Sequence, residues 1–520
     1  MPRPFDLDGL TLDAVRAGAL AGVPVAVLGL ARTGVGLARF LVDMGAEVTV
    51  YDGQPAAALA DRIAQLEGRP IRLLAGPAVD PAAAWAGAVL VAFSPSITPG
   101  FPTTEPRLRA ALDALVARRA AGDPDAPVLV SEPDLALRLC PVTPTVGVTG
   151  TKGKTTTASL AAHILAGDPA HPAVLGGNIG LPLIDRVLGL SAANRVVVEL
   201  SELQLPSLTR GTTVAVYTNV TADHLDRHGS LAGYRAVKRR LAELVDPAGA
   251  LVLNLDDPVV GGYAGLGTAP AVCYRLDRPI PGGVGLVDGW VVAAGVERLP
   301  GAGGGAAWTG PGGRVMPVGE FSLPGRHNIS NLLAAVAVGL LFGIAPDAIR
   351  AAAATFEGVE HRLEPVGLVD GVRFVNDSQG TQPDAVAAAL RSFDPPLVLI
   401  AGGRDKGVDL APLAPVVAER AAAAVLIGES GPALAALFRA AGLRQVEEAG
   451  TLDAAVPRAN ELARQLLASA APGSVATVLL SPAAASFDQF ADYAARGRAF
   501  KSAVAAIAAA AVAAGPERKG

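Results

Sequence analysis

The segment Thr145-Val-Gly-Val-Thr149-Gly150-Thr151-Lys152-Gly153-Lys154-Thr155-Thr156 decides the fold of the central part of the chain. Its first residues form a β-branched run that predicts a buried strand, and residues 157–165 predict the helix that follows. In such a unit backbone N–H groups hold phosphate oxygens, Lys154 neutralises the β- and γ-phosphates, and the Thr155 hydroxyl can bind Mg²⁺. The usual phosphate loop has one more glycine, at the position of Val148, so this is a shorter form. We expect phosphate binding here, with an ordinary glycine turn as the alternative.

Strands and helices alternate on both sides of this segment. Candidate strands are residues 25–28, 47–51, 195–200, 214–218, 250–254, 372–376, 397–401, 424–427 and 475–480. The alternation predicts parallel sheets with right-handed crossovers, whose ligands lie at the carboxyl ends of the strands. The predicted fold class is α/β with three domains: a Rossmann-like N-terminal domain (1–126), a central P-loop ATPase-like parallel sheet with inserted hairpins (127–358), and a C-terminal Rossmann-like domain (359–520). The Gly- and Pro-rich residues 278–318 predict the hairpins or mobile loops.

Length and composition limit the class of protein. A chain of 520 residues is too long for one core, and 51% hydrophobic against 18% charged residues predicts a soluble globular protein. The net charge of −5 offers no basic surface for nucleic acid. The longest apolar stretches, 332–344 and 503–514, fall short of the roughly 18 residues that span a bilayer, so we expect no membrane insertion. The acidic N-terminus is unlike a signal peptide, and we expect a cytoplasmic protein that acts as a monomer.

Two more segments of the central part carry polar residues at strand ends. Glu199 lies where a nucleotide site would place a Mg²⁺ ligand, although a strand-end glutamate is as often structural. The loop that follows the next strand contains His224 and His228, two of the six histidines of the chain. Their presence in one loop favours a functional site there.

The N-terminal domain has its own glycine turn, Gly29-Leu-Ala31-Arg32-Thr33-Gly34-Val-Gly36, and Asp52 closes the next strand. The spacing is similar to a dinucleotide fingerprint, but Ala31 replaces the glycine that lets a pyrophosphate approach closely. A nucleotide diphosphate at the helix N-terminus therefore fits better than NAD, with plain tight packing as the alternative.

Several motifs, in order, resemble the Mur ligase family of peptidoglycan synthesis. Residues 150–156 look like the short P-loop of that family, residues 176–180 like its substrate-binding loop, and residues 323–331 like its adenine-contacting segment. The match continues through residues 361–362, 375–378, 402–407 and 480–490. The last two, with the N-terminal domain, are similar to the branch that adds glutamate to UDP-N-acetylmuramoyl-L-alanine. The resemblance extends over nearly the whole chain.

This resemblance implies an ATP- and Mg²⁺-dependent ligase that activates a carboxylate as an acyl phosphate for attack by the glutamate amine. The implied ATP contacts are Gly150, Thr151, Lys152, Gly153, Lys154, Thr155, Thr156, Asn328, Asn331, Arg362 and Asp377. The implied UDP-sugar contacts are Arg32, Thr33, Asp52 and Asn178, and the implied glutamate contacts are Thr381, Lys406, Ser486 and Tyr493. The implied metal ligands are Thr155, Glu199, His224 and Lys238, of which the last would be carbamylated; a solvated helix lysine is the alternative at that position. Lys154, His224 and Lys238 are the implied catalytic residues.

Three positions depart from the pattern of the glutamate-adding branch. Lys152 stands where asparagine is usual, Glu202-Leu203 replaces Ser-Phe, and Gln379 replaces a lysine. Loss of that lysine charge beside the acceptor favours L-glutamate, which a minor branch adds, with D-glutamate as the alternative.

Three other functions stay open on the sequence. A folylpolyglutamate-type ligase shares the short P-loop but would not need the N-terminal domain. An NAD-dependent oxidoreductase is disfavoured by Ala31, and a non-catalytic nucleotide-binding scaffold would bind ATP without turnover.

Overall fold

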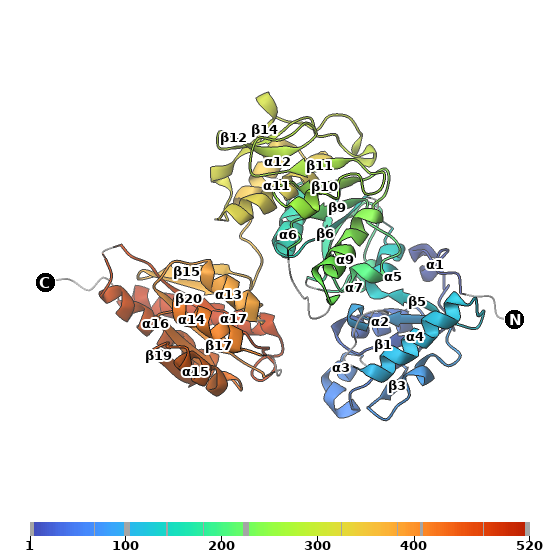
Figure 1. Cartoon of the computed structure of the whole chain (residues 1–520), viewed down its shortest axis with the longest axis horizontal. Helices are drawn as coiled ribbons and strands as arrows, with labels where there is room; N and C mark the ends of the chain where they lie inside the picture. Colours follow the sequence, from blue (N-terminus) through green and yellow to red (C-terminus); the bar gives the residue numbers. More distant parts are fainter. Residues whose placement is uncertain are drawn as a thin grey trace. The chain divides into compact units, whose positions relative to one another are not determined.

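The computed structural model of the chain describes residues 5–66, 68–97, 105–141, 144–179, 181–221, 228–323, 325–381, 383–405, 409–471 and 473–514. The chain forms two compact units, Met1–Phe356 and Glu357–Gly520. Together they contain three sheets, and the α/β class expected from the sequence is confirmed (Figure 1). Within the described residues, no helix has the length and apolar character needed to cross a membrane.

The N-terminal sheet belongs to the first unit and is parallel throughout, in the order β3-β2-β1-β4-β5. Its strands are β1 (Pro24–Leu28), β2 (Glu47–Asp52), β3 (Ile71–Ala75), β4 (Leu90–Phe93) and β5 (Val128–Ser131). The helices around it are α1 (Leu12–Arg16), α2 (Arg32–Asp43), α3 (Ala60–Ala64), α4 (Pro106–Ala120) and α5 (Glu132–Leu139). This is the Rossmann strand order without the sixth strand. Because β5 pairs with β4, the sheet continues beyond residue 126, where we expected the first domain to end.

The second sheet of this unit has the order β14-β13-β12-β11-β10-β9-β6-β8-β7. Its strands are β6 (Thr145–Thr149), β7 (Ala173–Gly177), β8 (Arg195–Glu199), β9 (Val214–Tyr217), β10 (Ala250–Asn254), β11 (Ala271–Tyr274), β12 (Val284–Val287), β13 (Trp290–Ala293) and β14 (Arg314–Pro317). The strands from β7 to β12 pair in parallel, and β12, β13 and β14 are antiparallel. The Gly- and Pro-rich segment therefore forms the expected hairpins.

The helices of this second sheet build the core around the glycine turn. They are α6 (Lys154–Leu165), α7 (Ile184–Val187), α9 (Leu231–Glu243), α10 (Pro258–Gly261), α11 (Arg326–Leu341) and α12 (Pro346–Thr355). Helices α6 and α11 contact each other and the sheet, and they bury Val148, Leu160 and Leu333 completely in one apolar cluster. Burial of such side chains is the main stabilising term for this layer.

Two helices begin earlier than the sequence indicated. Helix α6 begins at Lys154, three residues before residue 157, and α2 begins at Arg32, within the stretch that the sequence describes as a glycine turn. The first turns contain Thr and Gly, whose low helix propensity makes them look like turn residues in the sequence. The structure extends both helices to the glycine turn, so that their N-terminal N–H groups face it.

The second unit has one sheet, in the order β15-β16-β20-β17-β18-β19. Its strands are β15 (Glu364–Val369), β16 (Val372–Asn376), β17 (Leu397–Gly402), β18 (Ala423–Ile427), β19 (Gln445–Gly450) and β20 (Ala476–Leu480), and its helices are α13 (Pro383–Arg391), α14 (Ala414–Arg420), α15 (Gly431–Ala440), α16 (Leu452–Ala468) and α17 (Tyr493–Ala514). Strand β15 is antiparallel to β16 and the other pairs are parallel. Asn376 pairs with Leu480, so the segments that follow β16 and β20 leave the sheet at the same edge.

Candidate functional site

The glycine turn between β6 and α6 has a backbone that requires glycine. Gly153 has φ +83°, in the left-handed region, and a Cβ there would lie 2.5 Å from the Asn331 Oδ1 atom of α11. Any other residue would be strained and would clash. Gly153 also precedes the helix without a side-chain cap, so the first N–H groups of α6 are available to a ligand.

Residues at the end of the neighbouring strand β9 fix this turn. The Thr151 N–H donates to Asn219 O (2.7 Å), and the Lys152 N–H donates to Asn219 Oδ1 (2.9 Å). The Thr218 hydroxyl donates to Lys152 O (2.6 Å). The turn is therefore held from outside as well as by its own helix, and its amides are preorganised for an anion.

Two lysines bring their ammonium groups to the same turn. Lys154 Nζ donates to Gly150 O (3.0 Å) and Thr151 O (2.9 Å). Lys238 Nζ donates to Gly150 O (2.9 Å) and Thr149 Oγ1 (3.3 Å). Lys154 thereby brings a positive charge to the turn, which suits a polyphosphate, and the Nζ atom of Lys238 is held at the same carbonyl oxygen.

Helix α9 places Lys238 against this turn. Ser230 caps the helix by accepting the Gly233 N–H, and Tyr234 and Lys238, four residues apart, lie on one face. The Tyr234 hydroxyl bonds Thr151 Oγ1 (2.9 Å), and Lys238 Nζ lies 5.6 Å from the Tyr234 ring centroid. Lys238 is fully buried, so the alternative of a solvated helix lysine is wrong.

Glu199 ends β8 as a buried carboxylate. Its Oε1 atom accepts a hydrogen bond from Asn178 Nδ2 (2.8 Å), and its main-chain oxygen accepts the Asn178 N–H (2.9 Å). Its Oε2 atom is buried and accepts no hydrogen bond from any described residue. An unpaired buried carboxylate oxygen is costly unless a cation binds it, so Glu199 fits a metal ligand. His224, the other expected ligand of this region, lies outside the described residues.

Two asparagines of α11 lie beside the start of α6. The Thr157 hydroxyl donates to Asn331 Oδ1 (3.2 Å), and Asn331 Nδ2 donates to Asn328 Oδ1 (3.3 Å). The residues that the sequence places around a nucleotide in the first unit are thus gathered at one helix start, with Thr155 partly exposed in its first turn.

The N-terminal sheet presents a second uncapped helix start. Arg32 is exposed at the first position of α2, and this helix has no side-chain cap. A Cβ on Gly34 would lie 1.8 Å from Gly29 O, so tight packing alone requires this glycine. The Asp52 carboxylate accepts the Leu30 N–H (2.8 Å) and thereby holds the turn. Close packing against Gly29 therefore explains Gly34, and the hydrogen bond from Leu30 explains the orientation of Asp52. The uncapped N-terminus of α2 is left for a ligand.

Two contacts join the N-terminal domain to the segment that follows Asn178, one from α2 and one from α5. Arg39 Nη2 forms an ion pair with Asp185 Oδ1 (2.9 Å). The Ile184 N–H donates to Glu132 Oε1 (3.0 Å), and burial raises the pKa of Glu132 to about 7. Sequence reasoning missed Glu132, because nothing around it distinguishes a buried strand-end carboxyl from an exposed one.

In the second unit, Asp377 follows β16 as a buried acid. Its Oδ2 atom accepts the Ser481 hydroxyl (2.6 Å), and its Oδ1 atom accepts the Leu363 N–H (3.2 Å). Burial raises the pKa of Asp377 to about 6, and the Ser481 hydrogen bond and the charge of Arg362 act against this rise. The exposed Arg362 therefore acts on this buried carboxyl electrostatically.

Two of the four expected glutamate residues lie on segments that leave the same sheet edge, and a third, Tyr493, is the first residue of α17. Thr381 belongs to the segment after β16 and Ser486 to the segment after β20, and the Ala483 N–H donates to Gly380 O (2.9 Å) between them. Lys406 lies outside the described residues.

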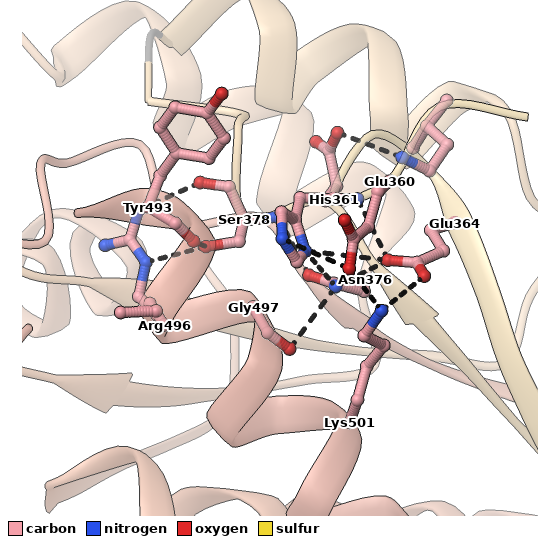
Figure 2. A network of polar contacts seen from close by, with 12 residues as sticks. Glu360, His361, Glu364, Asn376, Ser378, Tyr493, Arg496, Gly497 and Lys501 are labelled. Atoms are coloured by element: carbon pink, nitrogen blue, oxygen red, sulfur yellow. Dashed lines mark hydrogen bonds and ion pairs between the residues drawn. The ribbon is translucent and has the colours of Figure 1, made fainter. Parts of the chain in front are cut away.

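A polar network fixes the loop that carries Arg362 (Figure 2). His361 has φ +65°, and its N–H donates to Glu364 Oε2 (2.9 Å). Asn376 Nδ2 contacts both Glu364 Oε2 (2.8 Å) and His361 Nδ1 (3.0 Å), so His361 Nδ1 is an acceptor and the ring is neutral. Burial lowers the pKa of His361 despite its two glutamate neighbours. The strained turn at His361 sets the position of Arg362.

Comparisons with known proteins show the family of the chain. Family models match at residues 148–339 (Mur ligase middle domain) and 361–484 (Mur ligase, glutamate ligase domain). The UDP-N-acetylmuramoylalanine--D-glutamate ligase of Symbiobacterium thermophilum is 38% identical over 496 residues, which cover 94% of this chain and 100% of the relative. The enzyme of the same name from Anaeromyxobacter dehalogenans is 39% identical, covering 93% and 97% of the two chains.

A solved structure shows the same fold. The UDP-N-acetylmuramate-alanine ligase MurC of Thermotoga maritima aligns over 93% of this chain and 99% of its own, with a TM-score of 0.52 and 17% identity. At this identity the likeness concerns the fold alone.

Proposed function

The chain belongs to the Mur ligase family, and we propose that it joins glutamate to UDP-N-acetylmuramoyl-L-alanine with release of ADP and phosphate. The observation that carries the proposal is the full-length match to glutamate ligases, which includes the N-terminal sheet. That match leaves the folylpolyglutamate-type and NAD-dependent alternatives without support.

The chemistry that such a ligase needs is activation of a carboxylate, which is a poor electrophile. Phosphoryl transfer from ATP gives an acyl phosphate, and the glutamate amine then displaces phosphate. The amides of the Gly150–Thr156 turn would hold the phosphates, and Lys154 would stabilise the charge of the transferring group. Asn328, Asn331, Arg362 and Asp377 would complete the ATP site, and Arg32, Thr33, Asp52 and Asn178 would bind the UDP-sugar.

The residues that would hold Mg²⁺ are Thr155, Glu199, His224 and a carbamylated Lys238. The orphaned Glu199 Oε2 atom supports this set. When bound, the ion supplies charge neutralisation for the phosphate oxygens. Asn178 then has a further use, because its amide orients the Glu199 carboxylate.

Glu199→Gln should weaken metal binding about 10- to 100-fold, because it replaces an anionic oxygen with a neutral one at constant size. The expected readouts are a raised Mg²⁺ concentration for half-maximal turnover and weaker Mn²⁺ binding in paramagnetic resonance titrations with a non-hydrolysable ATP analogue. Glu297→Gln, at an exposed glutamate of the same unit, is the matched control. Unchanged Mn²⁺ binding would remove Glu199 from the metal set.

We propose D-glutamate as the acceptor. The relatives named above are D-glutamate ligases, so the expectation of L-glutamate finds no support and the alternative fits better. The departures that favoured L-glutamate do not all belong to one unit. Gln379 lies in the segment of Thr381, whereas Lys152 and Glu202 belong to the first unit.

Phosphate release from UDP-N-acetylmuramoyl-L-alanine and ATP should be much faster with D- than with L-glutamate. Both enantiomers carry the same two carboxylates, so discrimination comes from where the amine points once these are held. The measurement is kcat/KM for each enantiomer, with omission of the UDP-sugar as the blank. A higher value for L-glutamate would restore the first expectation, and no turnover with either would refute the proposed function.

A further inference from the structure

Arg496, in the first turn of α17, is a buried cation whose hydrogen bonds go to neutral oxygens. It is 1% exposed. Its guanidinium donates to Ser378 Oγ (3.0 Å), Ser378 O (2.9 Å), Ala484 O (3.1 Å) and Ala485 O (3.2 Å), which are all neutral oxygens. Figure 2 shows Arg496 beside Ser378. Among the described residues no carboxylate forms an ion pair with it, and the acid that acts on it electrostatically is Asp488.

Such an arrangement is costly. Carbonyl and hydroxyl dipoles compensate poorly for the free-energy cost of taking a cation out of water, and Asp488 acts on Arg496 electrostatically without forming an ion pair among the described residues. Burial lowers the pKa of Arg496 to about 10, so the guanidinium still carries its charge at neutral pH. A buried guanidinium that stays charged despite the cost of desolvation can attract an anionic ligand.

The guanidinium joins the two segments that carry the expected glutamate residues. These acceptor segments are residues 378–381, after β16, and residues 481–486, after β20. Arg496 binds Ser378 on one and Ala484 and Ala485 on the other. Ala485 O also accepts the Arg404 N–H (2.8 Å), and this hydrogen bond connects the segment after β17 to the segment after β20. One side chain therefore fixes three strand ends at one edge of the sheet.

The bonds of Arg496 also orient a peptide group. A trans peptide is planar, with its N–H and C=O pointing in opposite directions. Because Ala485 O points at the guanidinium, the N–H of Ser486 points away from it. Ala483, just before, has φ +57°, a left-handed conformation that needs support from its surroundings. The bonds to Ala484 and Ala485 give that support.

We propose that Arg496 is the positioning residue for the acceptor amino acid, and this inference rests on the proposed function. It fixes the two acceptor segments, so that Thr381 and the Ser486 amide keep their positions. Its charge also favours the carboxylates of the acceptor, because the guanidinium is buried and water screens it little.

The test compares Arg496→Met with Arg496→Lys in the full-length protein. Methionine keeps much of the side-chain volume and removes the charge, whereas lysine keeps the charge and loses the forked hydrogen bonds. Arg498→Met, at an exposed arginine of the same helix, is the matched control. For each protein, kcat and KM are measured for glutamate, for its monoamides glutamine and isoglutamine, and for the UDP-sugar, together with thermal unfolding.

For Arg496→Met we expect at least a tenfold higher KM for glutamate and less than a twofold change in the KM for the UDP-sugar. The preference for glutamate over at least one monoamide should fall at least tenfold. In Arg496→Lys this preference should stay within threefold of wild type while the KM for glutamate rises. A purely structural role would lower thermal stability, and it would lower kcat/KM for all substrates together. The preference for glutamate over its monoamides would then stay unchanged.

Wild-type preference and wild-type KM in a folded Arg496→Met protein would overturn the proposal. If Arg496→Met does not fold, Arg496→Lys decides: a selective rise in the KM for glutamate supports the proposal, and a parallel rise for both substrates overturns it. A wild-type protein without activity on glutamate would refute the proposed function instead, so the two failures are distinguishable.

Discussion

Replacing Lys154 with alanine is expected to lower ATP-dependent turnover by at least about 10³-fold, or about 4 kcal/mol of transition-state stabilisation. The phosphoryl group carries spread negative charge during transfer, and the Lys154 ammonium is held over the turn by Gly150 O and Thr151 O. Because this charge acts mainly on the transferring group, kcat should fall more than ATP affinity.

The fold should survive this substitution. Lys154 is partly exposed, and its hydrogen bonds go to two carbonyl oxygens of a surface turn that the β9 residues also hold. Loss of such bonds costs about 1 kcal/mol. Circular dichroism and the thermal midpoint should therefore change little. Arg186→Ala, which removes an exposed cation of α7, is the control and should keep wild-type turnover. Retention of more than a small fraction of phosphate release by Lys154→Ala would refute the assignment of this turn.

The sequence predicted the turn and the sheets because their signals are local. Strand β6, the glycines and α6 follow one another within 21 residues, 145–165, and each has the residue types that its structure requires. The strands named from the sequence agree with the observed bounds to within one residue, since buried parallel strands appear as continuous apolar runs. The family resemblance, carried by the same motifs, is confirmed by the comparisons.

Contacts between distant residues could not be predicted in this way. Lys238 forms a hydrogen bond with Gly150, which is 88 residues away in the sequence, and Arg496 forms one with Ser378, which is 118 residues away. Arg496 in particular looks like an ordinary basic residue near a helix start, and only the packing of α17 on β16 and β15 buries it. The enantiomer is a third case, because it depends on a few contacts whose geometry no motif records.

Lys238→Ala is expected to lower turnover at least about 10²-fold, and short carboxylic acids such as acetate should restore part of it. Lys238 is fully buried, with its Nζ atom between Gly150 O and Thr149 Oγ1. Addition of CO₂ to the neutral amine forms an N–C bond and releases a proton, which turns a cation into an anionic carbamate. Such an anion could bind Mg²⁺ beside Glu199, whereas an ammonium could not.

The rescue follows from the space that the truncation leaves. Removing the side chain beyond Cβ opens a polar cavity at the turn, which a small carboxylate can enter to replace the carbamate oxygens. Acetate should give no rescue to Lys154→Ala, where a cation is missing instead of an anion. Wild-type protein in ¹³C-bicarbonate should show a carbamate carbon signal that Lys238→Ala lacks. Near-normal activity of Lys238→Ala would exclude carbamylation as a requirement. Lost activity with neither rescue nor signal would assign Lys238 to holding the turn as an ammonium, through the two hydrogen bonds that its Nζ atom makes.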